Sequence, residues 1–542
     1  MSFSFNPGMG PRGAIGRFGQ EGKAGRFFDK NVILGMLAFI RPYRRKMAIA
    51  AVLMLLVTGF TLLTPYLIKV AIDDYIAVGN NDGLARIAIV TAVTYLCLYL
   101  TTMGQQYLLG WTSQRVLADV REAMMRHLQA LSLSYHDRTI IGVTVSRVIN
   151  DVAVINDLLT QGLLSLIGDI LVLVGIILIM LTMSPRLALL TFAVLPLMML
   201  VTYVFSLNAK GAFRLTRTRV AELVGNLAEN INGIRVIQAF AQEVAVETQF
   251  DEVNNANRQA HIEAMRLSFI FLPTIEFLGV LATAVVLYFG GRAVAADEVT
   301  LGVMVAFIAY VTRFFQPIQE LSRIYTTMQS AMAGGEQVLQ LLNTTPDVLD
   351  RHDADEMPPI QGHIQLQHVT FHYVADGQKI LHDVSLEIAP GQTVALVGPT
   401  GAGKTTIANL IPRFYEVTNG AVCIDGIDVR TVSQTSLRQQ FGLVPQDPFL
   451  FSGTIADNIR FGRLDAPLSD VIEAAKLANA HNFISALPDG YETKILEGAV
   501  NVSVGPRQLL CIARAALVNL RLLILDEATA SVDTVPEVLI HE

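Results

Sequence analysis

The sequence predicts an all-α membrane domain of six transmembrane helices followed by an α/β domain. Of its 542 residues, 52% are hydrophobic and only 16% are charged, whereas soluble domains carry about 25% charged residues. Long apolar runs alternate with basic loops over the first 343 residues. After residue 363, strand-like runs alternate with helix-like runs, which is the α/β pattern.

Six apolar runs are candidates for membrane spans, because a helix crosses the hydrocarbon core with about 20 apolar residues. The runs are Met47–Ile68, Ile87–Gln114, Leu158–Met183, Leu187–Asn208, Leu267–Gly291 and Val299–Thr312. The sixth run is short. We assign it as a span because an even number of spans returns the chain to the side where it began.

Basic residues orient these spans, since cytosolic loops carry an excess of Lys and Arg. The long loops, 115–157 and 209–266, are rich in Arg, and the short loops between the other spans are not. The long loops and both termini are therefore predicted to be cytosolic. Their apolar spacing suggests that the membrane helices continue into the cytosol. We expect an integral protein of a bacterial inner (cell) membrane, in contact with the lipid bilayer.

The chain divides into four predicted segments: a disordered cytosolic tail (1–30), the transmembrane domain (31–343), a linker (344–362) and the α/β domain (363–542). Strands are expected at Ile364–Tyr373, Val384–Ile388, Thr393–Val397 and Leu522–Leu525, and a helix is expected from Lys404. The net charge of −7 gives no support to nucleic acid as a partner.

Two acidic residues, Asp169 and Glu276, lie near the middle of the third and fifth spans. A carboxylate at this depth is unfavourable unless it faces a cavity or a partner. One interpretation is a substrate cavity for cationic or amphipathic compounds, and the alternative is a satisfied contact between helices. Gln105, Gln106 and Arg313, nearer the cytosolic leaflet, are further candidates for lining an inward-facing cavity.

A glycine-rich loop follows the expected strand Thr393–Val397 and opens a helix, which is the context of a phosphate-binding loop. Its residues are Gly398, Pro399, Thr400, Gly401, Ala402, Gly403, Lys404, Thr405 and Thr406. The glycines allow backbone N–H groups to face phosphate oxygens, and the helix N-terminus adds positive potential. Lys404 is expected to reach the β- and γ-phosphates of ATP, and the Thr405 hydroxyl is expected to ligate Mg²⁺.

Asp526 and Glu527 follow the apolar run Leu522–Leu525. That run is predicted to be a buried parallel strand, and ligands collect at the carboxyl ends of such strands. Asp526 is expected to hold Mg²⁺ through water, and Glu527 is placed to polarise the water that attacks ATP. The alternative for both residues is an ordinary cap on the next helix.

Together these motifs resemble ATP-binding-cassette (ABC) exporters of the half-transporter kind, in which six membrane helices are fused to one nucleotide-binding domain. The resemblance covers the chain from about residue 30 to its end. It implies that Tyr373 stacks on adenine, and that Gln446 contacts Mg²⁺ and the attacking water. It also implies that short coupling helices in the two long loops, around Leu133–Gly142 and Glu229–Phe240, press on nucleotide domains.

The sequence departs from the family at the signature segment, Leu-Ser-x-Gly-Gln, which grips the γ-phosphate of ATP held by the opposite subunit. Ser503 and Gly505 match this signature, but Pro506 replaces its glutamine. Proline is tolerated in a first helical turn, so we expect the fold to survive and the grip on the partner's ATP to be weakened. The family also has a switch histidine on a later strand. His541 is too close to Asp526 to be that residue, so we expect a domain that is incomplete at its C-terminus.

The resemblance implies ATP-driven export of an amphipathic compound, such as a drug, lipid or peptide. An intact Glu527 beside an altered signature favours a heterodimer with a second half-transporter, with a homodimer as the alternative. A different hypothesis is a non-catalytic or regulatory ATP-binding subunit, or an inactive fragment, of such a transporter.

Overall fold

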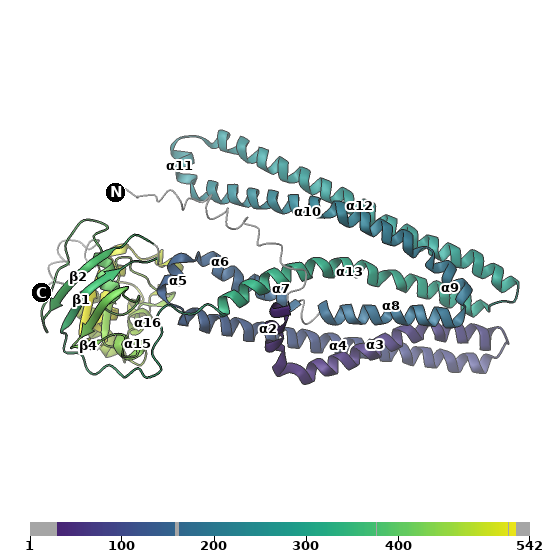
Figure 1. Cartoon of the computed structure of the whole chain (residues 1–542), viewed down its shortest axis with the longest axis horizontal. Helices are drawn as coiled ribbons and strands as arrows, with labels where there is room; N and C mark the ends of the chain where they lie inside the picture. Colours follow the sequence, from purple (N-terminus) through teal and green to yellow (C-terminus); the bar gives the residue numbers. More distant parts are fainter. Residues whose placement is uncertain (1–29, 158–161, 375–376, 519, 527–542) are drawn as a thin grey trace. The chain divides into compact units, whose positions relative to one another are not determined.

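The computed structural model describes residues 30–157, 162–374, 377–518 and 520–526 (Figure 1). They form two compact units. The first comprises the residues up to Arg126 together with Thr144–Asn343, and the second comprises His127–Val143 and the residues from Thr344 onward. The predicted disordered tail lies outside the described residues except for Lys30, where helix α2 begins.

Long helices make up the first unit. They are α3 (Arg44–Val70), α4 (Asn81–Ala130), α8 (Leu163–Met183), α10 (Leu195–Asn232), α12 (Glu243–Ala295) and α13 (Leu301–Leu342). The short elements of this part of the chain are α2 (Lys30–Ile40), η1 (Arg41–Tyr43), η2 (Ala71–Ile76), α6 (Ile141–Ser146), η3 (Arg147–Asp151), α7 (Val152–Asp157), α9 (Pro185–Phe192) and α11 (Ile234–Ala239).

Within the described residues, 5 helical stretches are long and apolar enough to cross a membrane, and α13 begins with a shorter apolar stretch, Leu301–Phe315. This division matches the five long runs and one short run of the sequence. The fourth stretch is broken between α9 and α10, where Pro196 lies in the first turn of the second helix. A proline cannot continue a preceding helix without loss of a hydrogen bond.

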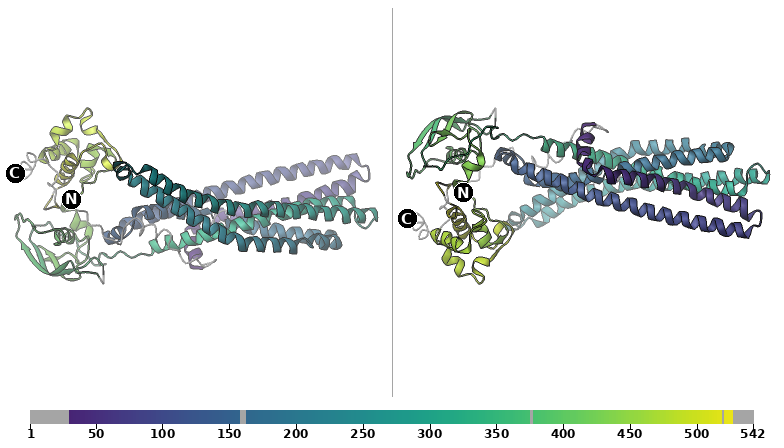
Figure 2. Two further views of the ribbon diagram at one scale, coloured as in Figure 1. Left: turned by 90° about the horizontal axis from the view of Figure 1, so that it is seen from above. Right: turned by 90° about the horizontal axis from the view of Figure 1, so that it is seen from below.

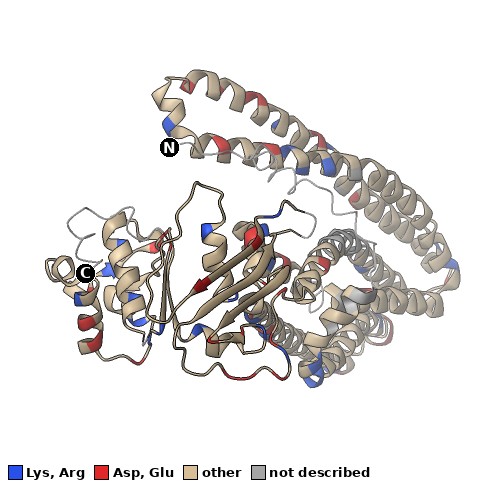
Figure 3. Cartoon of the chain, turned by 60° about the vertical axis from the view of Figure 1, so that its left-hand side comes forward, with Lys and Arg blue, Asp and Glu red and all other residues tan. Residues whose placement is uncertain are grey.

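The membrane helices extend well beyond the hydrocarbon core, as the sequence predicted. Helix α12 has 53 residues, or about 80 Å at 1.5 Å per residue, against a core of about 30 Å. Figure 2 shows α10 and α12 running side by side. In Figure 3 the charged residues of these two helices gather toward α11, and the rest of both helices is mostly uncharged.

A continuous apolar core holds α8, α9, α10, α12 and α13 together. Its fully buried side chains include Ile176, Met180, Ile275, Phe307 and Tyr310. Lipid is as apolar as these residues, so close packing rather than water exclusion stabilises the bundle.

One carboxylate joins the C-terminal end of the first span to the start of α13. Asp73, in η2, accepts hydrogen bonds from Thr300 Oγ1 at 2.5 Å and from the Gly302 N–H at 2.8 Å. Lys69 Nζ lies 3.5 Å away, and the Asp73 side chain is 9% exposed. A Cβ on Gly302 would lie 2.6 Å from Asp73 Cγ, so the glycine makes this approach possible.

The described residues of the second unit form three sheets. A four-stranded antiparallel sheet has the order β2-β1-β3-β4, and two-stranded sheets pair β5 with β8 and β6 with β7. The strands are β1 (Ile364–Phe371), β2 (Leu381–Ile388), β3 (Asn419–Ile424), β4 (Ile427–Asp428), β5 (Phe441–Val444), β6 (Gly453–Thr454), β7 (Lys494–Ile495) and β8 (Leu522–Leu525). The helices are α5 (Leu133–Arg138), α14 (Lys404–Leu410), α15 (Gln434–Arg438), α16 (Ile455–Arg460), α17 (Leu468–Leu477), α18 (His481–Ser485) and α19 (Val504–Ala516), with short 3-10 turns at η5 (Gly490–Glu492) and η6 (Glu497–Ala499).

The prediction of a strand at Thr393–Val397 was wrong. The segment has no regular secondary structure, and Val397 is 93% exposed. An apolar, β-branched run becomes a strand only where a neighbouring strand supplies hydrogen bonds and cover. In the described part of the chain, β8 pairs with β5 alone, and Leu523 and Leu525 are 48% and 45% exposed.

The predicted linker, 344–362, is an irregular segment bound along the second unit. The Asp425 carboxylate accepts from the N–H groups of Gln361, Gly362 and His363 at 2.6, 3.1 and 2.9 Å. Farther upstream, Arg413, which is 2% exposed, donates to Asp350 at 3.3 Å. Side chains from the sheet and helices therefore replace the regular hydrogen bonds that this segment lacks.

We predict that Asp73→Ala lowers the melting temperature of the detergent-purified protein by a few degrees. The substitution leaves the Gly302 N–H and the Thr300 hydroxyl without their acceptor, a loss of about 1–3 kcal/mol. Asp74→Ala is the matched control, because Asp74 is exposed. Equal melting temperatures for the two variants would contradict the role of Asp73.

Candidate functional site

The phosphate-loop segment 398–403 turns sharply into α14. Gly401 and Gly403 have φ of 86° and 92°, in the left-handed region where a side chain is unfavourable. A Cβ at Gly403 would lie 2.7 Å from Leu381 Cδ2. Glycine is therefore required at this position by the backbone and by the neighbouring strand.

Lys404 folds back over the loop. Its Nζ donates to the Gly398 carbonyl at 2.7 Å and to the Pro399 carbonyl at 3.2 Å. Pro399, Thr400, Gly401 and Ala402 are exposed, so the loop is accessible. An ammonium group beside an accessible loop at a helix N-terminus suits the binding of phosphate oxygens.

Asp526 follows strand β8 and lies beside the start of α14. Thr405 Oγ1 is 3.2 Å from Asp526 Oδ1, and the Asp526 N–H donates to the Val444 carbonyl at 3.0 Å. Because β5 and β8 are parallel and Val444 pairs with Leu525, Gln446 follows β5 at the same edge of the sheet. Glu527 lies outside the described residues.

A hydroxyl and a carboxylate side by side fit Mg²⁺, which prefers oxygen ligands and usually takes one or two carboxylates together with substrate phosphates. The part of the chain that the structure describes contains no cluster of three or more His, Cys, Asp or Glu that could hold a metal. Thr405 and Asp526 therefore suit a magnesium ion that also binds the phosphates of a nucleotide.

Tyr373 lies against the helix that carries the phosphate loop. Its hydroxyl is 3.0 Å from Thr406 Oγ1. The rings of Phe371 and Tyr415 contact it edge to face, with centroids 4.8 and 5.1 Å away. The half-buried ring is thus held between β1 and α14 beside the loop, at a position that a nucleotide base could reach.

Helix α5, from the first long loop, packs on this aromatic cluster of Phe371, Tyr373 and Tyr415. The Tyr415 hydroxyl donates to the Asp137 carboxylate, and Arg138 donates to the Tyr373 carbonyl. Burial, and then the bond to Asp137, raise the pKa of Tyr415 well above its ordinary value. Tyr415 therefore stays protonated and remains a donor.

The family resemblance predicted that the first long loop, around Leu133–Gly142, contacts a nucleotide domain. It did not identify Tyr415, which binds this loop. No local pattern marks that residue, because its partner lies 278 positions away.

Ser503 is the N-cap of α19, and Gly505 and Pro506 lie in its first turn. The prediction that proline is accommodated there is confirmed, because the N–H groups of a first turn have no partner within the helix. The Arg507 N–H, one residue later, donates to the Ser503 carbonyl at 3.1 Å. Replacement of the family's glutamine therefore removes a donor from the exposed end of α19 without breaking the helix.

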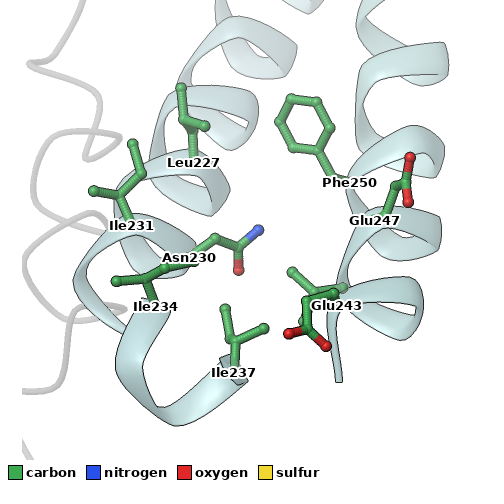
Figure 4. Close-up of a pocket in the computed structure, with 9 residues that line it drawn as sticks. Leu227, Asn230, Ile231, Ile234, Ile237, Glu243, Glu247 and Phe250 are labelled. Carbon is green, nitrogen blue, oxygen red and sulfur yellow. The ribbon is translucent and has the colours of Figure 1, made fainter. Parts of the chain in front are cut away.

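The second long loop, 209–266, turns at the short helix α11. This helix lies within the segment Glu229–Phe240, where the resemblance implied a short helix. A pocket of about 420 Å³ lies where α10, α11 and α12 meet (Figure 4). Its lining is mostly aliphatic, with Asn230, Glu243 and Glu247 as the polar members. Val236 and Phe240 are 61% and 71% exposed, so the end of this loop presents apolar surface that is typical of a binding interface.

The two candidate residues of the substrate cavity lie on different helices. Asp169 is half-buried on α8, and Glu276 is exposed on α12. Their contribution to a cavity therefore stays a prediction.

The chain matches two family models. Residues 47–318 match the ABC transporter transmembrane region, and residues 381–530 match the ABC transporter model. It is 36% identical over 509 residues to the uncharacterized ABC transporter ATP-binding protein YknV of Bacillus subtilis, a match that covers 94% of this chain and 84% of the relative.

Two similar relatives have named substrates. An ATP-dependent lipid A-core flippase of Syntrophus aciditrophicus is 34% identical, with 97% of this chain and 88% of the relative covered. A fatty acid ABC transporter ATP-binding/permease protein of Mycobacterium tuberculosis is 38% identical, with 86% of this chain and 73% of the relative covered. Among solved structures, a bacterial Atm1-family ABC exporter with ATP bound gives a TM-score of 0.76 at 27% identity, over 92% of this chain and 88% of that one.

We predict that Asp526→Asn and Thr405→Val weaken the binding of a fluorescent ATP analogue about tenfold in Mg²⁺ but not in EDTA. Each variant removes an oxygen ligand for the metal, and loss of about 1.4 kcal/mol corresponds to a tenfold change. Thr405→Ser keeps the hydroxyl and serves as the control. Equal weakening with and without Mg²⁺ would mean that the two residues only hold the loop in shape.

Proposed function

The chain belongs to the ABC transporter family, and we propose that it exports an amphipathic compound as one half of a dimeric transporter. It carries the membrane and ATPase regions of an ATP-driven exporter in one polypeptide. The observation that supports the ATPase role most directly is the contact between Thr405 and Asp526 beside the phosphate loop.

In the proposed reaction, the N–H groups of the phosphate loop and Lys404 hold the phosphates of ATP, and Tyr373 stacks on adenine. Thr405, Asp526 and Gln446 would hold Mg²⁺, which would neutralise phosphate charge. Glu527 accepts a proton from the attacking water. Closure of two nucleotide domains around ATP would drive the membrane helices from inward- to outward-facing, and hydrolysis would reset them.

The proposed substrate is amphipathic because the relatives named above handle a lipid and a fatty acid, and another relative is named as a putative multidrug export protein. An acid in the middle of a span is by default a functional-site hypothesis. Asp169 and Glu276 are accordingly proposed as cavity residues.

The proposed dimer is a heterodimer. A partner with a regular signature would complete the ATP site built on Lys404 and Glu527 of this chain. The opposite site would receive Ser503, Gly505 and Pro506 from this chain and would be the weaker of the two. The removal of a donor by Pro506 favours this asymmetry.

The same observation supports a second candidate function, a non-catalytic ATP-binding subunit. In that case this chain would bind ATP and regulate a catalytic partner. ATP binding is common to both functions, whereas turnover that depends on Glu527 distinguishes them.

We predict that the purified chain alone hydrolyses ATP no faster than its Glu527→Gln variant. A homodimer would place Pro506 in both sites, where a donor to the γ-phosphate is needed. Pro506→Gln, which restores the family's residue, is expected to raise turnover about a hundred- to a thousandfold, the effect of one hydrogen-bond donor to a transition state. Robust Glu527-dependent turnover by the unmodified chain would refute the heterodimer argument.

We predict that Glu276→Gln reduces the efflux of cationic dyes from cells that express the transporter, because it removes a negative charge from the pathway. Expression and basal ATPase activity are measured in parallel. Unchanged efflux of every dye tested would exclude Glu276 from the cavity.

A further inference from the structure

A proline in the first membrane span leaves one backbone carbonyl without its helical donor. Pro65, inside α3, has no N–H to give to the carbonyl four residues earlier, that of Thr61. In a membrane such a group must find a partner within the protein. Arg313 of α13 supplies that partner by donating from Nη1 to the Thr61 carbonyl.

A second donor lies one turn away on α13. The Tyr310 hydroxyl donates to the Leu62 carbonyl at 2.6 Å, and the Tyr310 side chain is fully buried. Arg313 is only half-buried. Tyr310 therefore packs as a core residue, whereas Arg313 remains partly accessible.

The depth of Arg313 makes its charge unusual. It lies 12 residues after the first residue of α13, Leu301, about 18 Å along the helix at 1.5 Å per residue. The hydrocarbon core is about 30 Å thick, so Arg313 lies past its middle, toward the predicted cytosolic leaflet. An arginine at this depth is unfavourable and by default marks a functional site.

Within the described residues, Arg313 has no carboxylate partner, and its one polar contact is the Thr61 carbonyl. A guanidinium is always charged and has five N–H donors in a planar fork. One donor is used by Thr61, which fixes the side chain. The others remain available to a ligand with paired, negatively charged oxygens.

We propose that Arg313 binds the anionic head group, a carboxylate or phosphate, of an amphipathic substrate within the membrane. Pro65 and Thr61 orient the guanidinium before the substrate arrives, which reduces the entropy lost on binding. The inference rests on the proposed export function and adds an anionic head group to the features that the transporter would recognise in an amphipathic substrate. It assigns the recognition of this anionic group to Arg313, whereas Asp169 and Glu276 would contact cationic compounds.

The test uses the full-length chain in lipid nanodiscs and a matched pair of fluorescent probes, dansyl-undecanoic acid and its methyl ester. The wild-type protein should bind the acid about tenfold more tightly than the ester, as one charge-assisted pair provides. Arg313→Gln should lose this preference by weakening the acid alone. Arg313→Lys, which keeps the charge but not the fork, should retain part of it.

Tyr310→Phe is the matched control, because it removes the neighbouring hydrogen bond to α3 and leaves Arg313 in place. It should keep the preference for the acid. A dansyl amine of similar length is the cationic probe. The proposal is overturned if Arg313→Gln binds the acid as tightly as wild type, if it weakens acid and ester equally, or if wild type binds neither or prefers the amine.

A second measurement distinguishes an error in the proposed export function from an error in the proposed anion site at Arg313. ATP-dependent movement of the acid is followed in proteoliposomes that contain the chain together with its partner subunit. Binding that depends on Arg313 without any transport would contradict the export function and leave the anion site intact. Transport of the acid at an equal rate by Arg313→Gln would contradict the site alone.

Discussion

Both units are shaped by the requirement that every backbone N–H and C=O find a partner. In the membrane this requirement is absolute, so the first unit consists of helices. Where Pro65 interrupts the pattern, a side chain from α13 supplies the missing donor. At the phosphate loop, by contrast, backbone N–H groups have no partner within a helix or sheet. There the glycine-rich turn and the N-terminus of α14 leave N–H groups for a ligand.

The second unit links its nucleotide site to α5 through side chains rather than through a continuous secondary structure. Arg138 contacts the Tyr373 carbonyl, and the Tyr373 hydroxyl contacts Thr406. Tyr415 contacts the Tyr373 ring and donates to Asp137. A movement of α5 would therefore alter the aromatic cluster beside the phosphate loop. The cluster is a physical connection between a membrane-domain loop and the proposed adenine site.

Local patterns predicted most elements of the fold because apolar spacing and glycine content act within a few residues. The five long spans, the short sixth one, β1, β2, β8 and the start of α14 all follow such patterns. The strand expected at Thr393–Val397 fails because a strand depends on a neighbour that its own residues do not encode. The contact between Thr405 and Asp526 was predictable because each residue belongs to a motif of its own. Thr405 belongs to the phosphate loop, and Asp526 follows the apolar run Leu522–Leu525.

By itself the sequence determined that apolar helices precede an α/β nucleotide-binding unit, and it predicted that a phosphate loop and an acidic strand end form the site of this unit. Hydrophobicity and motif spacing are properties of the amino-acid sequence and do not depend on how distant residues pack. Only the tertiary structure decided which distant side chains meet. It paired Asp73 with Gly302, Asp137 with Tyr415, and Arg313 with the carbonyl freed by Pro65. Such pairs depend on how helices and strands pack, and packing brings together residues that no local pattern connects.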